Sequence, residues 1–280
     1  MKRLLQIEWL KLRHYRPFWV LGGLYVVVIT VASLGTHFFL QYLKSQGADF
    51  RGIDPTIVPF YDFPDVWQNL PYIATYLKLF LAFLVIMTIC NEVTYRTLRQ
   101  NIIDGMSKQD WIGSKFLLLL ALALAGTILL FFLGLFTGLL WGHPESYSSI
   151  FHSIEFLFAY LLEVTTFLSF ALFLALLIRR PGVVIIGLTM YTLVLEPILS
   201  LILIENLRYA TDSSIWETFF GKLAHFFPIR AINNLIHVPY QRYALMEIQD
   251  YVSLREALIV VGWLFLSLYG SFWLLRKRDL

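Results

Sequence analysis

The hydrophobic residues of this chain gather into six long runs separated by polar segments. The runs cover residues 17–40, 72–90, 116–141, 156–178, 182–204 and 257–275. Each is close to the roughly 20 residues that an α-helix needs to cross a hydrocarbon core about 30 Å thick. The pattern therefore predicts an all-α polytopic membrane protein, with residues 1–280 forming a single transmembrane domain of six helices.

Composition supports this class and excludes an ordinary soluble domain. Hydrophobic residues make up 58% of the chain and charged residues 15%, whereas soluble domains contain about 25% charged residues. The single cysteine, Cys90, cannot form an intramolecular disulfide. We therefore expect the fold to be held together by helix packing.

Lysine and arginine are distributed unevenly between two sets of connecting segments. Fourteen lie in the N-terminus, the second and fourth connections and the C-terminal tail, whereas seven lie in the alternate loops. Basic residues accumulate on the cytoplasmic side of a membrane, so both termini are expected in the cytoplasm. The excess of positive charge then indicates orientation and does not require a nucleic-acid partner.

Residues 1–16 mix basic and apolar side chains. Leu5, Trp9 and Leu12 recur at helical spacing, which predicts an amphipathic helix lying at the membrane interface. An ordinary basic flank before the first membrane span is the alternative.

The segment 91–115 is longer than a connection between two spans requires. Tyr95, Leu98 and Ile102 recur at helical spacing, which predicts that the second span continues into the cytoplasm as an amphipathic helix. Asp104-Gly105 ends this helix, and Ser107 with Asp110 resembles the start of another. We expect a helix, a tight turn and a helix that dock a soluble partner; a hairpin lying on the membrane is the alternative.

Two segments on the opposite side differ in character. Residues 41–71 contain several aspartates and are expected to form a solvated connector. Residues 205–256 are rich in aromatic side chains with helical spacing up to Pro228, which predicts amphipathic helices in or dipping into the outer leaflet. A compact soluble cap is the less favoured alternative, because so many exposed aromatic rings would be unfavourable in water.

Three ionisable residues interrupt the apolar runs: Lys78, Glu163 and Glu196. Charges are costly inside a membrane, so each is a functional candidate. At about 1.5 Å per helical residue, all three lie roughly 9–12 Å from the outer ends of their spans and could meet in one layer. A structural ion pair, or Lys78 extending toward the membrane surface, is the alternative to a role in a transport pathway. Pro197 directly after Glu196 predicts a kink.

Gly134, Gly138 and Gly142 form a stripe of small residues on the third span. Such a stripe permits close approach of another helix. Both intramolecular packing and dimerisation are compatible with it.

The sequence lacks the familiar catalytic motifs. It contains no G-x-x-x-x-G-K-[ST] nucleotide-binding loop, no H-E-x-x-H metal motif and no G-x-S-x-G nucleophile motif. Its six histidines lie in predicted loops or near the ends of spans, which excludes a pair of haem ligands at mid-membrane depth. We therefore expect no catalytic residue, no cofactor and no metal in this chain.

The basic N-terminus LLQIEWLKLR, the six spans and the segment NEVTYRTLRQNIIDGMSKQDWIGSK together resemble a known family. They are similar to the membrane subunit of ABC exporters of the type-2 permease family, in the bacterial branches that export antibiotic peptides or sodium or serve gliding motility. The residues that match the family's pattern in this segment are Glu92, Thr97, Leu98, Gly105, Ser107, Lys108 and Lys115.

The resemblance implies a permease in the bacterial cytoplasmic membrane, paired with a second permease subunit and two cytoplasmic ATP-binding subunits. ATP and Mg²⁺ would be bound by those partners. It also implies a coupling helix, around Glu92 to Asp110, that contacts the ATP-binding subunit. The candidate coupling residues are Glu92, Tyr95, Arg96, Leu98, Arg99, Gly105, Ser107 and Lys108.

The resemblance further implies that the second and fifth spans line the translocation pathway, which would place Lys78 and Glu196 in it. Two other functions remain open. One is an ATP-independent secondary transporter that uses Lys78, Glu163 and Glu196 for ion coupling, and the other is a membrane anchor or sensor that transports nothing.

Overall fold

The computed structural model describes residues 2–46, 60–142, 150–209, 223–237 and 251–277, and these are helical without any strand. The helices, in chain order, are α1 (Lys2–Arg13), α2 (Arg16–Ser45), α3 (Val66–Thr75), α4 (Lys78–Thr94), α5 (Thr97–Ile103), α6 (Lys108–Trp141), α7 (Glu155–Ile178), α8 (Pro181–Met190), the π-helical turn η2 (Tyr191–Leu195), α9 (Glu196–Tyr209), α11 (Pro228–Asn233) and α13 (Leu254–Lys277).

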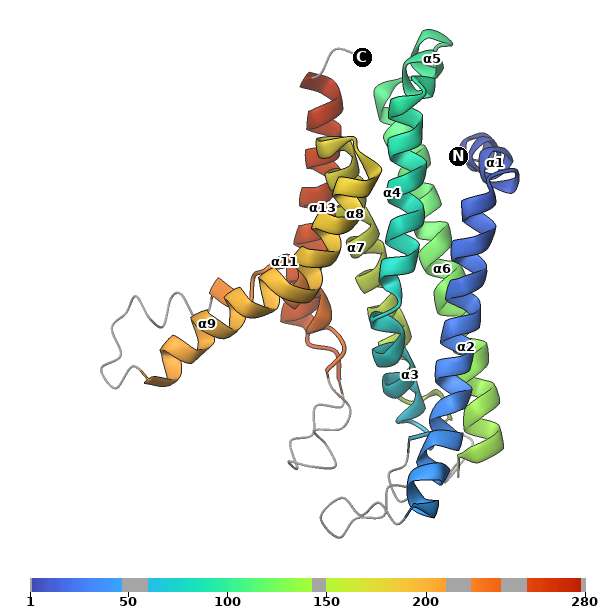
Figure 1. Cartoon of the computed structure of the whole chain (residues 1–280), viewed down its shortest axis with the longest axis vertical. Coiled ribbons are helices and arrows are strands. Elements are labelled where there is room, and N and C mark those ends of the chain that lie inside the picture. Colours follow the sequence, from blue (N-terminus) through green and yellow to red (C-terminus); the bar gives the residue numbers. More distant parts are fainter. Residues whose placement is uncertain (1, 47–59, 143–149, 210–222, 238–250, 278–280) are drawn as a thin grey trace.

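Helix α7 lies at the centre of the bundle (Figure 1). It packs against α13, α4, α6 and α3, and also against α8 and α11. Its side chains are mostly buried, with Phe167, Leu168 and Leu172 completely so. The hydroxyl groups of Tyr25 and Tyr160 form a buried hydrogen bond of 2.7 Å that joins α2 to this central helix.

Five of these helical segments are long and apolar enough to cross a membrane: α2, α6, α7, α13 and the continuous stretch Pro181–Leu203. Helices α3 and α4 pass the same test together, but they are bent by 44° at the break between them. These long apolar helices indicate a membrane protein.

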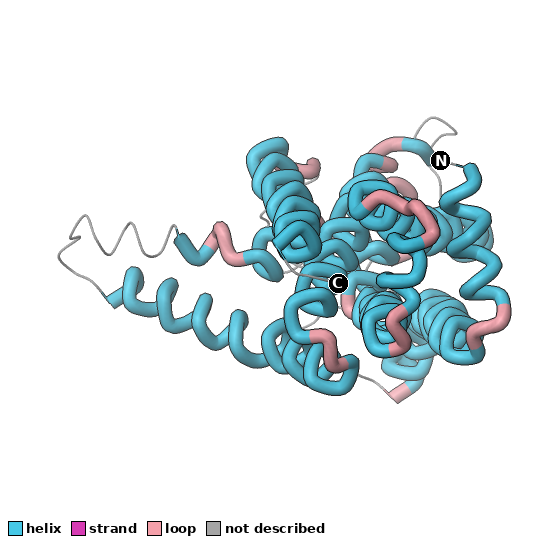
Figure 2. Tube along the Cα trace, turned by 90° about the horizontal axis from the view of Figure 1, so that it is seen from above, coloured by secondary structure: helices cyan, strands magenta, loops and turns pink. Residues whose placement is uncertain are grey.

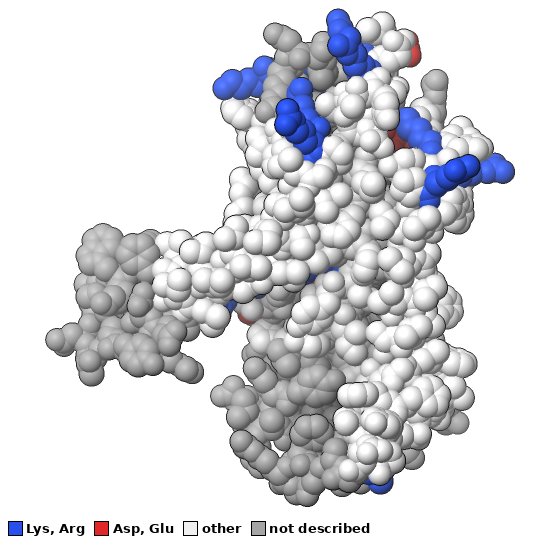
Figure 3. Space-filling model, viewed as in Figure 1, with Lys and Arg blue, Asp and Glu red and all other residues white. Residues whose placement is uncertain are grey.

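Both chain ends and helix α5 lie at one end of the bundle (Figure 1). Lysine and arginine side chains gather at this end, and the apolar middle of the same face shows almost no charge (Figure 3). We call it the basic end. It includes Lys11 and Arg13 of α1, Arg96 directly before α5, Arg99 within α5, Lys108 and Arg276.

The predicted second run is a broken helix that begins earlier than expected. The break lies at Tyr76 and Leu77, whose amides donate to the carbonyl oxygens of Ile73 and Ala74, three residues before each. This tighter spacing interrupts the α-helical ladder. The break places the amino end of α4, with Lys78, in the interior of the bundle.

The expectation of a solvated connector is wrong for residues 60–71, while residues 47–59 lie outside the described part of the chain. Phe60, Tyr61, Phe63 and Trp67 are buried. The rings of Trp67 and Phe63 pack on Gly134 and Gly138 of the α6 glycine stripe, and the Tyr61 carbonyl lies against Gly142; a methyl group added at Gly134 would lie 2.7 Å from the Trp67 ring. The stripe therefore serves intramolecular packing.

The helix that runs from α8 through η2 to α9 leans away from the bundle, and Figures 1 and 2 show α9 extending sideways from it. A kink is predicted at Pro197. In the structure, the π-helical turn Tyr191–Leu195 ends two residues before this proline. Proline lacks the N–H that would donate to the carbonyl four residues earlier, which favours a wider turn at this point.

The prediction of outer helices across 205–256 falls partly on residues 210–222 and 238–250, which lie outside the described residues. Pro228, expected to end a helix, instead begins α11. Pro228, Ile229 and Ile232 are buried, and α11 contacts α7, α9 and α13. This short helix is thus inserted into the bundle.

Candidate functional site

A cluster of buried charges surrounds Lys115 near the basic end. Its ammonium group donates to Glu8 Oε2 at 2.7 Å and to Glu92 Oε1 at 2.5 Å. Lys115 is fully buried, and Glu8 and Glu92 are only 2% and 6% exposed. Buried ions are tolerated when they are paired and hydrogen-bonded, and both conditions hold here.

Further side chains complete this cluster. Trp111 donates its indole N–H to Glu92 Oε2 at 3.0 Å, and Ser114 donates to Glu8 Oε1 at 3.3 Å. Lys11 lies 3.2 Å from Glu92 Oε1 and 3.5 Å from Glu8 Oε1. The ionic cluster, defined as Glu8, Lys11, Glu92 and Lys115, therefore ties α1, α4 and α6 to one another.

The segment between α4 and α6 forms a small projection at the basic end, which we call the knob (residues 95–107). The expected continuous helix is broken, because Arg96 has a left-handed backbone (φ 58°) that separates α4 from α5. Gly105, with φ 97°, makes the next turn, as glycine does most easily. Ser107 caps α6 by accepting from the Asp110 amide at 3.0 Å.

The break changes which side chains face the protein. Leu98 is buried as predicted, but Tyr95 is 74% exposed and does not share its face, since the left-handed residue turns the chain between them. Arg96 and Arg99 are exposed, and Ile103 is 67% exposed. The knob thus presents two guanidinium groups beside two large apolar side chains.

Lys108 links the carboxyl side of the knob to the last helix. Its ammonium group donates to the carbonyl oxygen of Leu275 in α13 at 2.8 Å. At the root of the knob, Thr97 donates to the carbonyl oxygen of Glu92 at 3.2 Å. Both roots of the knob are therefore bonded to long apolar helices, α4 and α13.

The predicted N-terminal helix is present as α1, and it packs on α6. Leu12 is buried together with Glu8, whereas Leu5 and Trp9, on the same predicted face as Leu12, are 42% and 50% exposed. Trp9 forms edge-to-face contacts with Phe18 and Trp19. The ion pair between Glu8 and Lys115 therefore fixes α1 to α6 and leaves Leu5 and Trp9 on the surface.

A second buried ion pair lies deeper in the bundle, where Lys78 Nζ is 2.7 Å from Glu163 Oε1. The same ammonium group donates to Asn233 Oδ1 of α11 at 2.6 Å. Thr75 donates to the other carboxylate oxygen of Glu163 at 3.1 Å. Of the three predicted intramembrane charges, the structure thus brings two into direct contact.

Glu196 takes a separate position at the amino end of α11. Its carboxylate accepts from the backbone amides of Ile229 at 3.1 Å and Arg230 at 2.5 Å. Amides at a helix start lack partners within their own helix, so Glu196 supplies acceptors that α11 needs. Because Asn233 of α11 binds Lys78, the three charges belong to one connected network.

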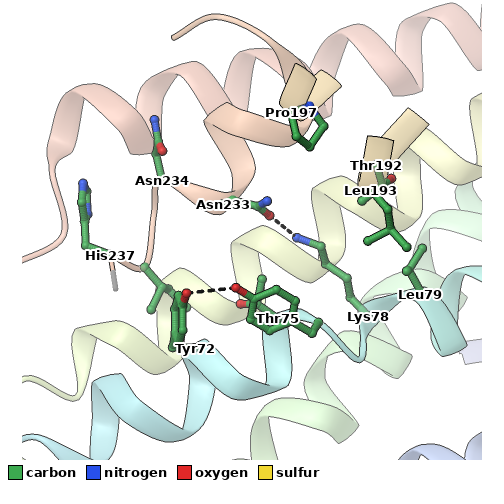
Figure 4. Close-up of a pocket in the computed structure, with 12 residues that line it drawn as sticks. Tyr72, Thr75, Lys78, Leu79, Thr192, Leu193, Pro197, Asn233, Asn234 and His237 are labelled. Carbon is green, nitrogen blue, oxygen red and sulfur yellow. Dashed lines mark hydrogen bonds between the residues drawn. The ribbon is translucent and has the colours of Figure 1, made fainter. Parts of the chain in front are cut away.

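A cavity of about 450 Å³ opens beside this network, between α3, α4, η2, the start of α9 and α11 (Figure 4). Lys78 and Asn233 lie in its middle, Asn234 and His237 toward one side, and Leu79 and Leu193 toward the other. Burial lowers the pKa of His237 below its usual value of 6.5, which disfavours the charged form of its imidazole. Among the residues of the described segments that line the cavity, Lys78 is the one lysine or arginine.

Several of these residues are not indicated by the pattern of charges and apolar runs. They are Glu8, Trp111, Thr192 and Asn233. Glu8 has a detectable signal, because it is the single acidic residue among the first 48 of the chain. Trp111 and Asn233 are ordinary residues whose partners, Glu92 and Lys78, lie 19 and 155 residues away in sequence, and Thr192 is an ordinary residue that lines the cavity.

A comparison with protein families matches residues 26–280 to the family described as "Protein of unknown function (DUF2705)". No curated protein matches the chain. The assignment to the type-2 permease family of ABC exporters is therefore wrong, since the matched family is a different one.

Proposed function

Because this chain belongs to the DUF2705 family, whose function is unknown, we propose a function from its own geometry. The chain acts as the membrane permease subunit of an ATP-driven exporter. It has no ATPase site of its own; a separate cytoplasmic subunit binds ATP and Mg²⁺ and pulls or pushes on the knob.

This proposal includes a topology. The α3–α4 pair counts as one bent span, which makes six spans with both termini in the cytoplasm of a bacterial cell. Two permease subunits and two ATP-binding subunits form the complex, with the pathway between the permeases. The concentration of lysine and arginine at the basic end supports this orientation.

One observation carries the proposal: α4 connects the root of the knob to the cavity. Glu92 lies in the ionic cluster at one end of α4, and Lys78 lines the cavity at the other. Fourteen residues of helix separate them, or roughly 21 Å. A displacement of the knob is transmitted along this helix, because the ionic cluster fixes α4 to α1 and α6.

The exposed surface of the knob suits docking. Tyrosine and arginine are the residue types that most often dominate binding energy at protein interfaces. Tyr95, Arg96, Arg99 and Ile103 would fit a groove with an apolar floor and an acidic rim.

The test compares Arg99→Glu on the knob with Arg276→Glu, a matched exposed arginine on α13 at the same end of the bundle. The chain is isolated gently from its native membrane, and co-purified proteins are identified by mass spectrometry. We expect a soluble ATP-binding protein in stoichiometric amount with the unmodified chain and with Arg276→Glu. Its recovery should fall about tenfold or more with Arg99→Glu, since one charge reversal at an interface centre costs at least about 1.4 kcal/mol.

Other outcomes would contradict the proposal. Recovery of the chain alone, even after mild crosslinking, would favour an ATP-independent transporter based on the Lys78–Glu163 pair. A partner that binds the knob while the reconstituted complex moves no solute would favour a membrane anchor.

A further inference from the structure

We propose that the cavity beside Lys78 binds an amphiphile whose head group is anionic, a carboxylate or a phosphate ester. The cavity lies where two interrupted helices meet, the α3–α4 break and the π-helical turn η2. This inference goes beyond the proposed function, because binding in the cavity requires no ATP-binding partner.

Lys78 supplies the first donor. An ammonium group has three N–H bonds, and the two polar contacts described for Lys78 are to Glu163 and Asn233. Lys78 also lines the cavity. The Phe167 ring also lies 5.1 Å from Nζ, but it offers no oxygen or nitrogen acceptor, so the third N–H has no such acceptor among the described residues and can serve one on a bound molecule.

Thr192 supplies the second donor. Its side chain is 92% buried, lines the cavity, and its hydroxyl has no hydrogen-bond partner in the described part of the chain. A buried hydroxyl without a partner is costly, and such groups are rare. A ligand oxygen would remove this cost.

The other helical threonines show how unusual Thr192 is. Seven of them donate to the carbonyl oxygen four residues earlier, namely Thr30, Thr36, Thr88, Thr127, Thr137, Thr166 and Thr189. In the described part of the chain Thr165 is also buried without a partner, but it does not line the cavity. Thr192 belongs to η2, where the π-helical turn changes the spacing of the backbone carbonyls.

The cavity is itself amphipathic. Figure 4 shows Asn234 and His237 on one side of Lys78, and Leu79 and Leu193 on the other. Leu193 is also 57% exposed on the outside of the bundle. An alkyl chain would therefore leave the cavity between α4 and η2, toward the lipid-facing surface.

The charge of the lining favours an anionic head group. Among the described lining residues, Lys78 carries the ammonium group and none carries a carboxylate. The carboxylates of the adjoining network already have partners: Glu163 is paired with Lys78, and Glu196 accepts from the backbone amides of Ile229 and Arg230. Glu163 offsets part of the charge of Lys78, so the head group is held mainly by hydrogen bonds. Such bonds are about twice as strong when the acceptor is ionised, which favours a carboxylate or phosphate over a sugar. The volume of about 450 Å³ lies within the usual range for small-molecule sites.

The test uses the whole chain in dodecyl maltoside micelles and titrates dodecyl phosphate, with native mass spectrometry to count bound molecules. The detergent is itself a neutral amphiphile with the same alkyl chain and is present in excess. It therefore competes for any site that recognises the alkyl chain alone. We expect one dodecyl phosphate per chain. Thr192→Val should weaken binding about tenfold, the size expected for losing one hydrogen bond to a charged group.

Thr189→Val is the matched control, because its hydroxyl already donates to the Ile185 carbonyl within the helix; binding should be unchanged. The double variant Lys78→Met/Glu163→Gln removes both charges together, which avoids an unpaired buried carboxylate, and it should also lose binding. Equal binding by Thr192→Val and Thr189→Val would overturn the proposal. So would equal binding of dodecyltrimethylammonium, or of inorganic phosphate without an alkyl chain.

Discussion

At the scale of single residues, Lys115 is the centre of the buried ion pairs near the basic end. It is fully buried and serves two carboxylates, Glu8 and Glu92, from two different helices. Burying an ion pair contributes little net stability, but removing one partner leaves an uncompensated buried charge. The cluster therefore fixes which helices lie together more than it adds to stability.

This asymmetry gives a prediction for Lys115→Met. Two carboxylates would share the partly exposed Lys11 alone, so the free energy of unfolding should fall by about 3–5 kcal/mol, measured as thermal unfolding in detergent. Lys277→Met, at an exposed lysine over the Trp273 ring, is the control and should change it by less than about 1 kcal/mol. Adding Glu8→Gln to Lys115→Met should recover part of the loss; no recovery would mean that packing, and not charge, is responsible.

Some members of these charged and polar clusters can be recognised from the sequence, and others cannot. Lys78 and Glu163 are conspicuous because they interrupt apolar runs, and their similar depths correctly indicate that they can meet. Lys115 is less conspicuous because it lies in the polar segment directly before an apolar run, where a lysine is expected to be solvated. Thr192 cannot be recognised at all, since its unpaired hydroxyl results from the π-helical turn around it.

At the scale of helices, the glycine positions of α6 are constrained by the aromatic side chains packed on them. Gly134 lies beneath the ring of Trp67, which is 1% exposed, donates to the Ile150 carbonyl and stacks on Phe131 at 5.7 Å. That ring cannot move aside without losing these contacts.

Gly134→Ala should therefore lower the free energy of unfolding by about 1–3 kcal/mol, the usual cost of overpacking. Gly23→Ala on α2 is a matched change with open space around the new methyl group, and it should leave stability equal or up to about 1 kcal/mol higher, as expected for replacing a helical glycine. Thermal unfolding of both variants measures the difference. Equal effects would mean that the ring of Trp67 adapts.

Apolar periodicity predicts the existence of the long helices well and their ends less well. Helix α6 begins at Lys108, where the Ser107–Asp110 pair predicts a helix start, and it continues unbroken through the apolar run predicted from residue 116. In the knob, the left-handed Arg96 removes Tyr95 from the predicted face. No local signal requires arginine in that conformation, so the break could not be predicted.

At the scale of the whole molecule, the described fold places both ends of the chain and the knob at one end of the bundle. The opposite end includes the carboxyl end of α2 at Ser45. Cys90 is completely buried, so it should not react with a water-soluble maleimide that labels exposed cysteines.

This arrangement predicts a labelling pattern in sealed membrane vesicles. Gln100→Cys on α5 and Arg276→Cys on α13 should react from one side of the membrane, and Ser45→Cys from the other, with a membrane-impermeant maleimide. The unmodified chain is the background control. Labelling of Gln100→Cys and Ser45→Cys from the same side would disprove a membrane-crossing α2 and with it the proposed topology.

The overall arrangement is only partly accessible from the sequence. The number and order of apolar runs predict a helical membrane protein, because the length of each run is set by the bilayer. The insertion of α11 among α7, α9 and α13 depends on Glu196 meeting two backbone amides 33 and 34 residues later in the chain. Contacts over such separations leave no periodic pattern.

The ionic cluster also has a consequence for the order of synthesis. Glu8 and Lys115 are 107 residues apart in sequence, so the ribosome completes α1 long before its partner exists. At about 5–20 residues per second, the delay is roughly 5–20 s. During this time Glu8 must remain in water at the membrane surface, and α1 can take its final place only after α6 has been inserted.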